Sequence, residues 1–79
     1  MSIVHQIQSL WLIANRNALQ YRLIQNHERV LSAMRTPISF EAAHELDLQI
    51  ALDNASIQTQ LLMIDAQEKA LGKYLNKVA

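Results

Sequence analysis

Three histidines, His5, His27 and His44, are the side chains of this chain best suited to bind a metal ion. Metal sites on helices usually need ligands three or four residues apart, as in a His-x-x-x-His step, and no two of these histidines have that spacing. His44 has acidic neighbours, Glu41 and Glu45 among them. Catalytic zinc uses three protein ligands of defined geometry. We therefore interpret the histidines as surface residues paired with carboxylates, and we expect no metal site.

Four arginines in the first half of the chain are the candidates for binding an anionic substrate. The helical chorismate mutases bind a dianion with arginines between helices, but this chain lacks a third helix and that family's pattern of arginine and lysine. Catalysis needs a cleft, which two helices alone do not form. We expect no enzyme, no catalytic residue and no cofactor, and we expect the arginines to pair with acids of the second half. They are Arg16, Arg22, Arg29 and Arg35.

Two long helices joined by a short connection would position these side chains. Apolar residues recur at helical spacing on both sides of Pro37, the only proline in 79 residues. Proline disfavours the helical conformation in the residue before it, here Thr36, and Ser39 is a plausible N-cap for a second helix. We predict an all-α antiparallel two-helix hairpin in a single domain, with helices at about 3–35 and 40–77 and a turn at 36–39. A continuous kinked helix is the alternative.

Each predicted helix carries two apolar stripes, and the spacing does not decide which one faces inward. In the first half, one stripe comprises Ile3, Ile7, Leu10, Ala14, Tyr21, Ile24 and Leu31, with the polar residues Asn17 and Glu28 at two positions of its repeat. The other stripe runs from Leu12 to Met34. In the second half the stripes are Ile50, Ile57, Leu61, Ile64, Leu71, Leu75 and Val78, and Leu48, Leu52, Ala55, Leu62 and Ala66.

A polar residue interrupts one stripe in each half, and this predicts the register of the hairpin. If the turn centres near Pro37, Asn17 and Asn54 lie at one level between the helices. A buried asparagine in an apolar seam specifies register at some cost in stability. We therefore expect Asn17 and Asn54 to face each other.

The chain has more apolar side chains than two helices can hide from water. Apolar residues make up 51% of the sequence, and chains of this size bury only about 60% of their unfolded surface. We expect a homo-oligomer or another protein partner to complete a bundle. Tryptophan is enriched among interface anchors, and we expect the partner face to include Trp11, Leu12, Leu19, Leu62 and Tyr74.

Charge and composition narrow the classes of partner. The net charge is zero, with +3 on residues 1–38 and −3 on residues 39–79, so we do not expect nucleic acid to be the partner. An RNA-binding hairpin dimer, like the small plasmid-encoded ones, is nevertheless an alternative that would use the arginines. The longest early apolar run is Leu10–Ala14, too short to span a membrane. With no cysteine, these features predict a cytoplasmic location.

The stretch "ELDLQIALDNASIQTQLLMIDAQEKALGKYLNKVA", residues 45–79, resembles the second helix of small helical-hairpin proteins of bacterial type III secretion. The similarity lies in a Leu-x-x-Gln opening and a Leu-x-x-x-Leu-x-x-Val close. Needle and inner-rod subunits of this kind are self-assembling structural subunits, and small co-chaperones keep needle subunits soluble. Needle subunits begin with a polar segment, whereas this chain is apolar from Ile3. The resemblance therefore implies a co-chaperone, with the self-assembling subunit as the alternative.

Overall fold

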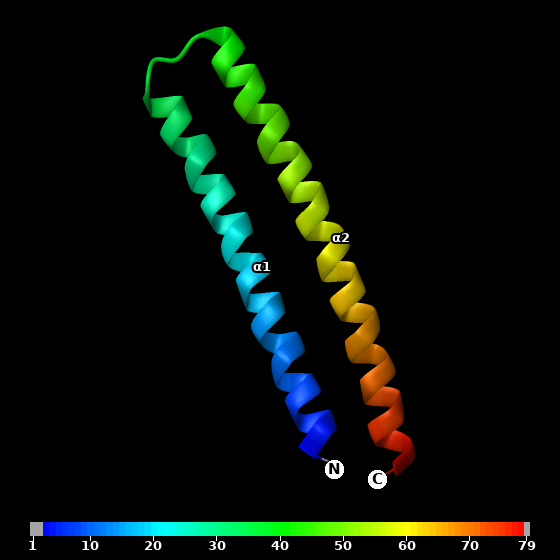
Figure 1. The fold of residues 1–79 in the computed structure, drawn as a ribbon. Helices are drawn as coiled ribbons and strands as arrows, with labels where there is room; N and C mark the ends of the chain where they lie inside the picture. The colour runs from blue at the N-terminus through cyan, green and yellow to red at the C-terminus, as the bar shows by residue number, and fades with distance from the viewer. Residues whose placement is uncertain (1–2, 79) are drawn as a thin grey trace.

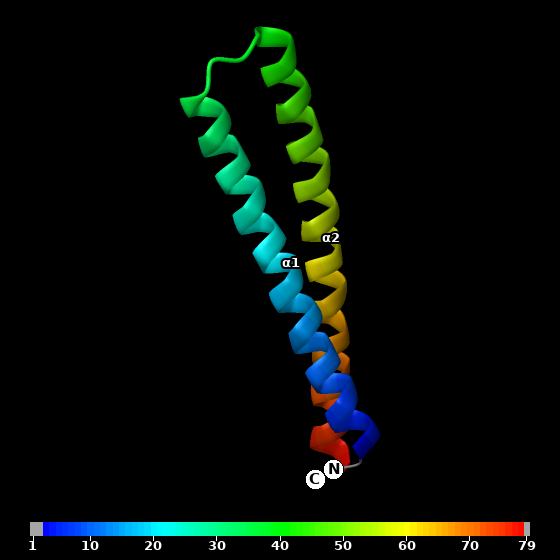
Figure 2. The ribbon, with the colours of Figure 1, turned by 60° about the vertical axis from the view of Figure 1, so that its left-hand side comes forward.

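The computed structural model is an antiparallel pair of long helices. It describes the backbone of residues 3–78 and the side chains of residues 3–74. Helix α1 spans Ile3–Arg35 and helix α2 spans Phe40–Val78. The two run side by side, with the turn at one end and both termini at the other (Figures 1 and 2). The all-α hairpin predicted from the sequence is confirmed. The side chains of Leu75 and Val78, members of one predicted stripe, lie outside the described residues.

The connection between the helices is set by the residues around Pro37. The Thr36 amide donates to the Ala33 carbonyl at 3.4 Å, and the Thr36 hydroxyl donates to the Ser32 carbonyl at 3.0 Å. Pro37 lacks an amide proton and cannot extend this ladder. At the start of α2 the Ser39 hydroxyl accepts a hydrogen bond from the Ala42 amide at 3.1 Å. This is the N-cap predicted from the sequence, and it satisfies a donor that the helix leaves free.

The two helices meet along an inner seam, which repeats every seven residues on each helix. On α1 it comprises His5, Leu12, Leu19, Asn26 and Ala33, and on α2 it comprises Ala43, Ile50, Ile57, Ile64 and Leu71. Leu12 and Ile57 are the most completely buried large side chains, and Leu23 and Leu61 pack against this core. The seven-residue repeat keeps one face of each helix turned toward its neighbour over the whole hairpin.

The hairpin is a thin rod that exposes much more surface than a compact domain of its size. Its extents are 58 × 15 × 14 Å and its radius of gyration is 17.9 Å, against about 12 Å for a compact chain of this length. The accessible surface is 6262 Å², whereas about 4,900 Å² is usual for a folded monomer of this mass. The excess of about 1,400 Å² follows because a helix in a hairpin has only one neighbour.

Neither helix carries an apolar stretch that could cross a bilayer, within the part of the chain described. Apolar residues lie on opposite sides of each helix and alternate with polar residues along it. The apolar surface is therefore distributed as stripes along the rod.

The inner seam predicts which side chains stabilise the hairpin. We expect Ile57→Ala to lower the free energy of unfolding by about 3 kcal/mol, because the truncated side chain is fully buried against α1. Leu52→Ala is the matched control on the exposed side of α2 and should cost less than about 0.5 kcal/mol. Urea unfolding followed by circular dichroism measures both. Equal losses for the two variants would contradict the assignment of the seam.

Candidate functional site

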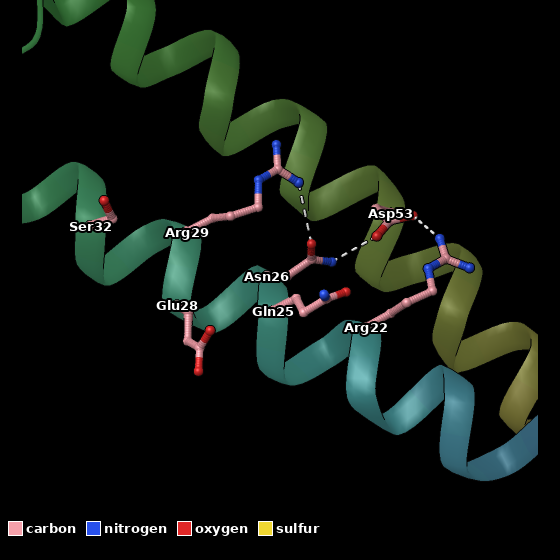
Figure 3. A pocket seen from close by; sticks show the side chains of 7 residues that line it. All are labelled: Arg22, Gln25, Asn26, Glu28, Arg29, Ser32 and Asp53. Carbon is pink, nitrogen blue, oxygen red and sulfur yellow. Dashed lines mark hydrogen bonds and ion pairs between the residues drawn. The ribbon is translucent and has the colours of Figure 1, made fainter.

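A polar cluster interrupts the inner seam near the middle of the hairpin. Asn26 is 4% exposed, and its amide nitrogen donates to Asp53 Oδ2 at 2.7 Å and to Asn54 Oδ1 at 2.8 Å. Arg29 Nη1 donates to Asn26 Oδ1 at 3.3 Å, and Arg22 forms an ion pair with Asp53. Figure 3 shows Asn26 reaching from α1 to Asp53 on α2 with an arginine on either side. We call these five residues the Asn26 cluster.

The Asn26 cluster fixes the electrostatic state of Asp53. The hydrogen bond that Asn26 donates lowers the pKa of the Asp53 carboxyl group below its ordinary value, and the positive charge of Arg22 lowers it further. Partial desolvation opposes these effects without cancelling them. Asp53 is therefore an anion at neutral pH, and it accepts hydrogen bonds from Arg22 and Asn26 of α1. The cluster acts as a register contact, since its members meet at only one alignment of the helices.

The Asn26 cluster borders a shallow hollow of about 580 Å³. Its other lining residues include Gln25, Ser32 and Glu28, and Glu28 points away from α2 in Figure 3. Arg22 and Asn26 each already bond to Asp53. In the portion of the chain that is described, no group of three histidine, aspartate or glutamate side chains could hold a metal ion. The contacts around this hollow hold the two helices together.

A second ion pair joins the helices nearer the termini. Arg16 contacts Asp65 and also Glu68, the latter at 3.0 Å. Beyond it, the rings of His5 and Tyr74 stack with centroids 4.3 Å apart. Arg16 and Arg22 therefore pair with acids of α2, as the complementary charges of the two halves predict.

The structure corrects the predicted partner face at two positions. Leu12 and Leu19, expected to contact a partner, are buried in the hairpin core at 1% and 7% exposed. They point inward because the polar residues of α1 that pair with α2, Arg16, Arg22 and Asn26, lie at or beside the same face of the helix. Trp11, Leu62 and Tyr74 are at least 47% exposed, so these three remain available to a partner. Their role as contacts stays a prediction.

The predicted pairing of Asn17 with Asn54 is wrong. Asn54 bonds to Asn26, whereas Asn17 is exposed on α1. Asn17 lies nine residues before Asn26, which is about 14 Å along a helix. The prediction failed because it assumed that the stripe of α1 containing Asn17 faces α2, whereas the stripe containing Leu12 and Leu19 does. Asn54 does sit in the seam, as expected, but with a different partner.

The most apolar stripe of α1 faces away from α2. Leu10 and Asn17 each lie two positions before a buried residue, Leu12 and Leu19, and two positions are about 200° around a helix. We call this stripe the back face of α1: Ile3, Ile7, Leu10, Ala14, Asn17, Tyr21, Ile24, Glu28 and Leu31, all exposed. The corresponding back face of α2 comprises Leu48, Leu52, Ala55, Leu62 and Ala66, also exposed.

The back face of α1 is poor in charge, since Glu28 is its single Lys, Arg, Asp or Glu residue. Between Ile3 and His27 the only Lys, Arg, Asp or Glu residues are Arg16 and Arg22, and both are engaged with α2. From Ile3 to His27, about 36 Å at 1.5 Å per residue, the back face itself therefore carries no charged residue. Depletion of charge and enrichment of aromatic side chains are typical of the centre of protein interfaces. This back face is the candidate functional surface of the molecule.

Comparison with models of protein families, with curated proteins and with solved structures finds no match to this chain.

Sequence reasoning missed Asn26 and Asp53, the two central residues of the register contact. Asn26 follows Leu12 and Leu19 at intervals of seven residues, and that spacing is the signal that marks it as a seam residue. A search for apolar periodicity reads an asparagine at such a position as a gap. Asp53 gave no signal alone, because it looks like any acid of an exposed helix face.

The Asn26 cluster predicts how the Asp53 carboxyl group titrates. We expect Asn26→Ala to raise the pKa of Asp53 toward its ordinary value, because it removes the hydrogen bond that lowers that pKa most. The matched control is Asn17→Ala, an asparagine on the back face, which should leave the pKa of Asp53 unchanged. Carbon-13 NMR of the Asp53 carboxyl group measures each titration. An equal effect of the two variants would contradict the observed register.

The same lowered pKa sets the direction of the pH dependence of stability. The unfolded chain binds a proton to Asp53 more readily than the folded chain does. Stability therefore rises with pH between the folded and the unfolded pKa of Asp53. The contribution of Asp53 is complete above its unfolded value of about 3.9 and is lost as pH falls through its folded value. Asp53→Asn should therefore weaken the acid dependence of the urea midpoint. An unchanged acid dependence would contradict the role assigned to Asp53.

Proposed function

We propose that this chain is a small protein-interaction module that buries the apolar back faces of its helices against another protein chain and catalyses no reaction. The observation that carries the proposal is the exposed back face of α1, which has no charged residue between Ile3 and His27. An amphipathic helix turns its apolar stripe toward a neighbour, so a helix with apolar stripes on opposite sides has room for two neighbours. Helix α2 covers one side of α1, and a partner would cover the other, as in helix bundles.

The extent of the exposed apolar surface supports this proposal. Among the described side chains, eighteen large apolar residues are exposed and six apolar residues form the buried core. Single exposed apolar residues are ordinary, but a contiguous patch marks an interaction site. Trp11, 58% exposed, borders the back face of α1 and supplies the kind of rigid anchor that dominates binding energy.

Within this class, the proposal is a cytoplasmic adaptor or co-chaperone of the kind that serves type III secretion. It is supported by the resemblance of residues 45–79 to that group and by a bare hairpin with apolar faces open to a client. A self-assembling structural subunit is the second candidate. It is favoured by the back face of α2, because packing α1 of one copy onto α2 of the next continues without closure.

RNA binding has weaker support than protein binding. A single helical face that binds RNA needs free cationic side chains to reach phosphates. Arg16 and Arg22 are paired with Asp65, Glu68 and Asp53, so phosphate contacts would have to break bonds that hold the hairpin together.

The proposal predicts the effect of a charge placed on the back face. Sedimentation and binding of the apolar dye anilinonaphthalene sulfonate, measured over a dilution series, report association and open apolar surface. We expect Leu10→Glu to weaken self-association or dye binding at least about tenfold, because a buried unpaired charge is costly. The matched control, Gln8→Glu, adds the same charge two residues away and should change neither. A stable helical monomer that neither associates nor binds the dye would contradict the proposal.

A further inference from the structure

We propose that the back face of α1 packs antiparallel against the same face of a second copy of this chain, with Asn17 on the two-fold axis. This inference rests on the proposed function and names its partner. The pattern of the back face, its charges, its packing volumes and its area all favour this arrangement.

Two pairs of large apolar residues on the back face of α1 are placed symmetrically about Asn17. Leu10 and Ile24 lie seven residues before and after it, and Ile3 and Leu31 lie fourteen residues before and after it. In an antiparallel pair centred on Asn17, Leu10 would therefore contact Ile24 of the second copy, and Ile3 would contact Leu31. A two-fold interface requires such a self-complementary surface, because each residue pair occurs twice.

The side-chain volumes nearest the axis also favour the antiparallel arrangement. Ala14 lies three residues before Asn17 and Tyr21 lies four residues after it. Antiparallel packing sets the small Ala14 against the large Tyr21 of the second copy on both sides of the axis. Parallel packing would set tyrosine against tyrosine and alanine against alanine, which crowds one level and leaves a void at the other.

Glu28, the single charged residue of the back face, also favours the antiparallel arrangement. In parallel packing the two Glu28 carboxylates would lie at one level and repel each other. In antiparallel packing each faces Ile7 near the end of the contact, and the two lie about 30 Å apart. The positions that flank the face carry no formal charge: Val4, Gln6, Trp11, Ile13, Ala18, Gln20 and Gln25.

Asn17 has a specific role at the axis. Two asparagine amides that meet there can each donate an N–H to the other's carbonyl oxygen, which satisfies both side chains without a charged partner. A polar residue at one position of an apolar seam specifies alignment. Asn17 would thus set the alignment between two chains, while Asn26 sets it within each hairpin.

The area available matches what a stable dimer needs. The back face of α1 from Ile3 to Leu31 is about 42 Å long. A standard interface buries about 800 Å² on each partner. The surface that the hairpin exposes beyond a compact monomer, about 1,400 Å², exceeds this requirement.

Disulfide formation between single cysteines tests the arrangement, because the natural chain contains no cysteine. The variants are Leu10→Cys, Ile24→Cys and Asn17→Cys, each in the full chain and each checked for helicity. Leu62→Cys on the back face of α2 is the matched control. Each variant, and an equal mixture of the first two, is oxidised with glutathione disulfide, and covalent dimers are quantified. Sedimentation of the reduced natural chain accompanies these measurements.

We expect Asn17→Cys to form a covalent dimer alone, and Leu10→Cys to cross-link with Ile24→Cys about tenfold more than either does with itself, because cross-linking follows local concentration. The control should not cross-link. Efficient self-cross-linking of Leu10→Cys and Ile24→Cys would overturn the antiparallel arrangement. Cross-linking of Leu62→Cys alone would also overturn this arrangement, because it would place the contact on the back face of α2. A monomer that binds the apolar dye would overturn the dimer and leave the interaction module standing, whereas a monomer that binds no dye would overturn both.

Discussion

Two helices that lie side by side can cover only one face of each other, and this constraint governs the whole molecule. The inner seam uses that face for Leu12, Leu19, Ile57 and the residues that repeat with them. Most other large apolar side chains among those described are exposed, and they must remain in water or meet another chain. The exposed Trp11, the back face of α1 and the surface excess all follow from this constraint. The hairpin therefore has a buried seam on one side of each helix and exposed apolar side chains on the other.

Polar contacts inside the seam decide which face of α1 turns inward. The inward face carries Arg16, Arg22 and Asn26 at or beside the seam, and all three have partners on α2. Rotating α1 by half a turn would bring its most apolar stripe against α2, but it would separate these residues from their partners. Each exposed ion pair contributes only about 0–1 kcal/mol. Asn26 contributes mainly specificity, since it finds Asp53 and Asn54 at one alignment only.

This choice of face has a functional consequence. A hairpin that kept its most apolar stripes inside would show water a mostly polar exterior and would need no partner. Here α1 presents its least charged surface outward over about 36 Å. On α1, the side that carries Asn26 aligns the two helices of the hairpin, and the back face that carries Asn17 is the exposed surface for which we propose association.

The sequence predicts the fold well and the site only in part. Helical periodicity and the residues around Pro37 were sufficient for the two helices, the turn and the Ser39 cap. The stripe of α2 that contains Ile50 and Ile57 faces inward, but apolar spacing could not decide between the two stripes of either helix. The choice depends on pairs such as Asn26 with Asp53, which are distant in sequence. Each such residue alone looks like a polar interruption, so the register could not be predicted.

The central claim is that the stability of this chain depends on covering the back face of α1 with another copy. The most direct test is the thermal midpoint of the natural chain, measured by circular dichroism at two protein concentrations that differ about 100-fold. If folding and association are coupled, mass action should raise the midpoint by about 5–10 °C at the higher concentration. A cooperative midpoint that is the same at both concentrations would contradict the claim, because the hairpin would then be stable with its back face in water.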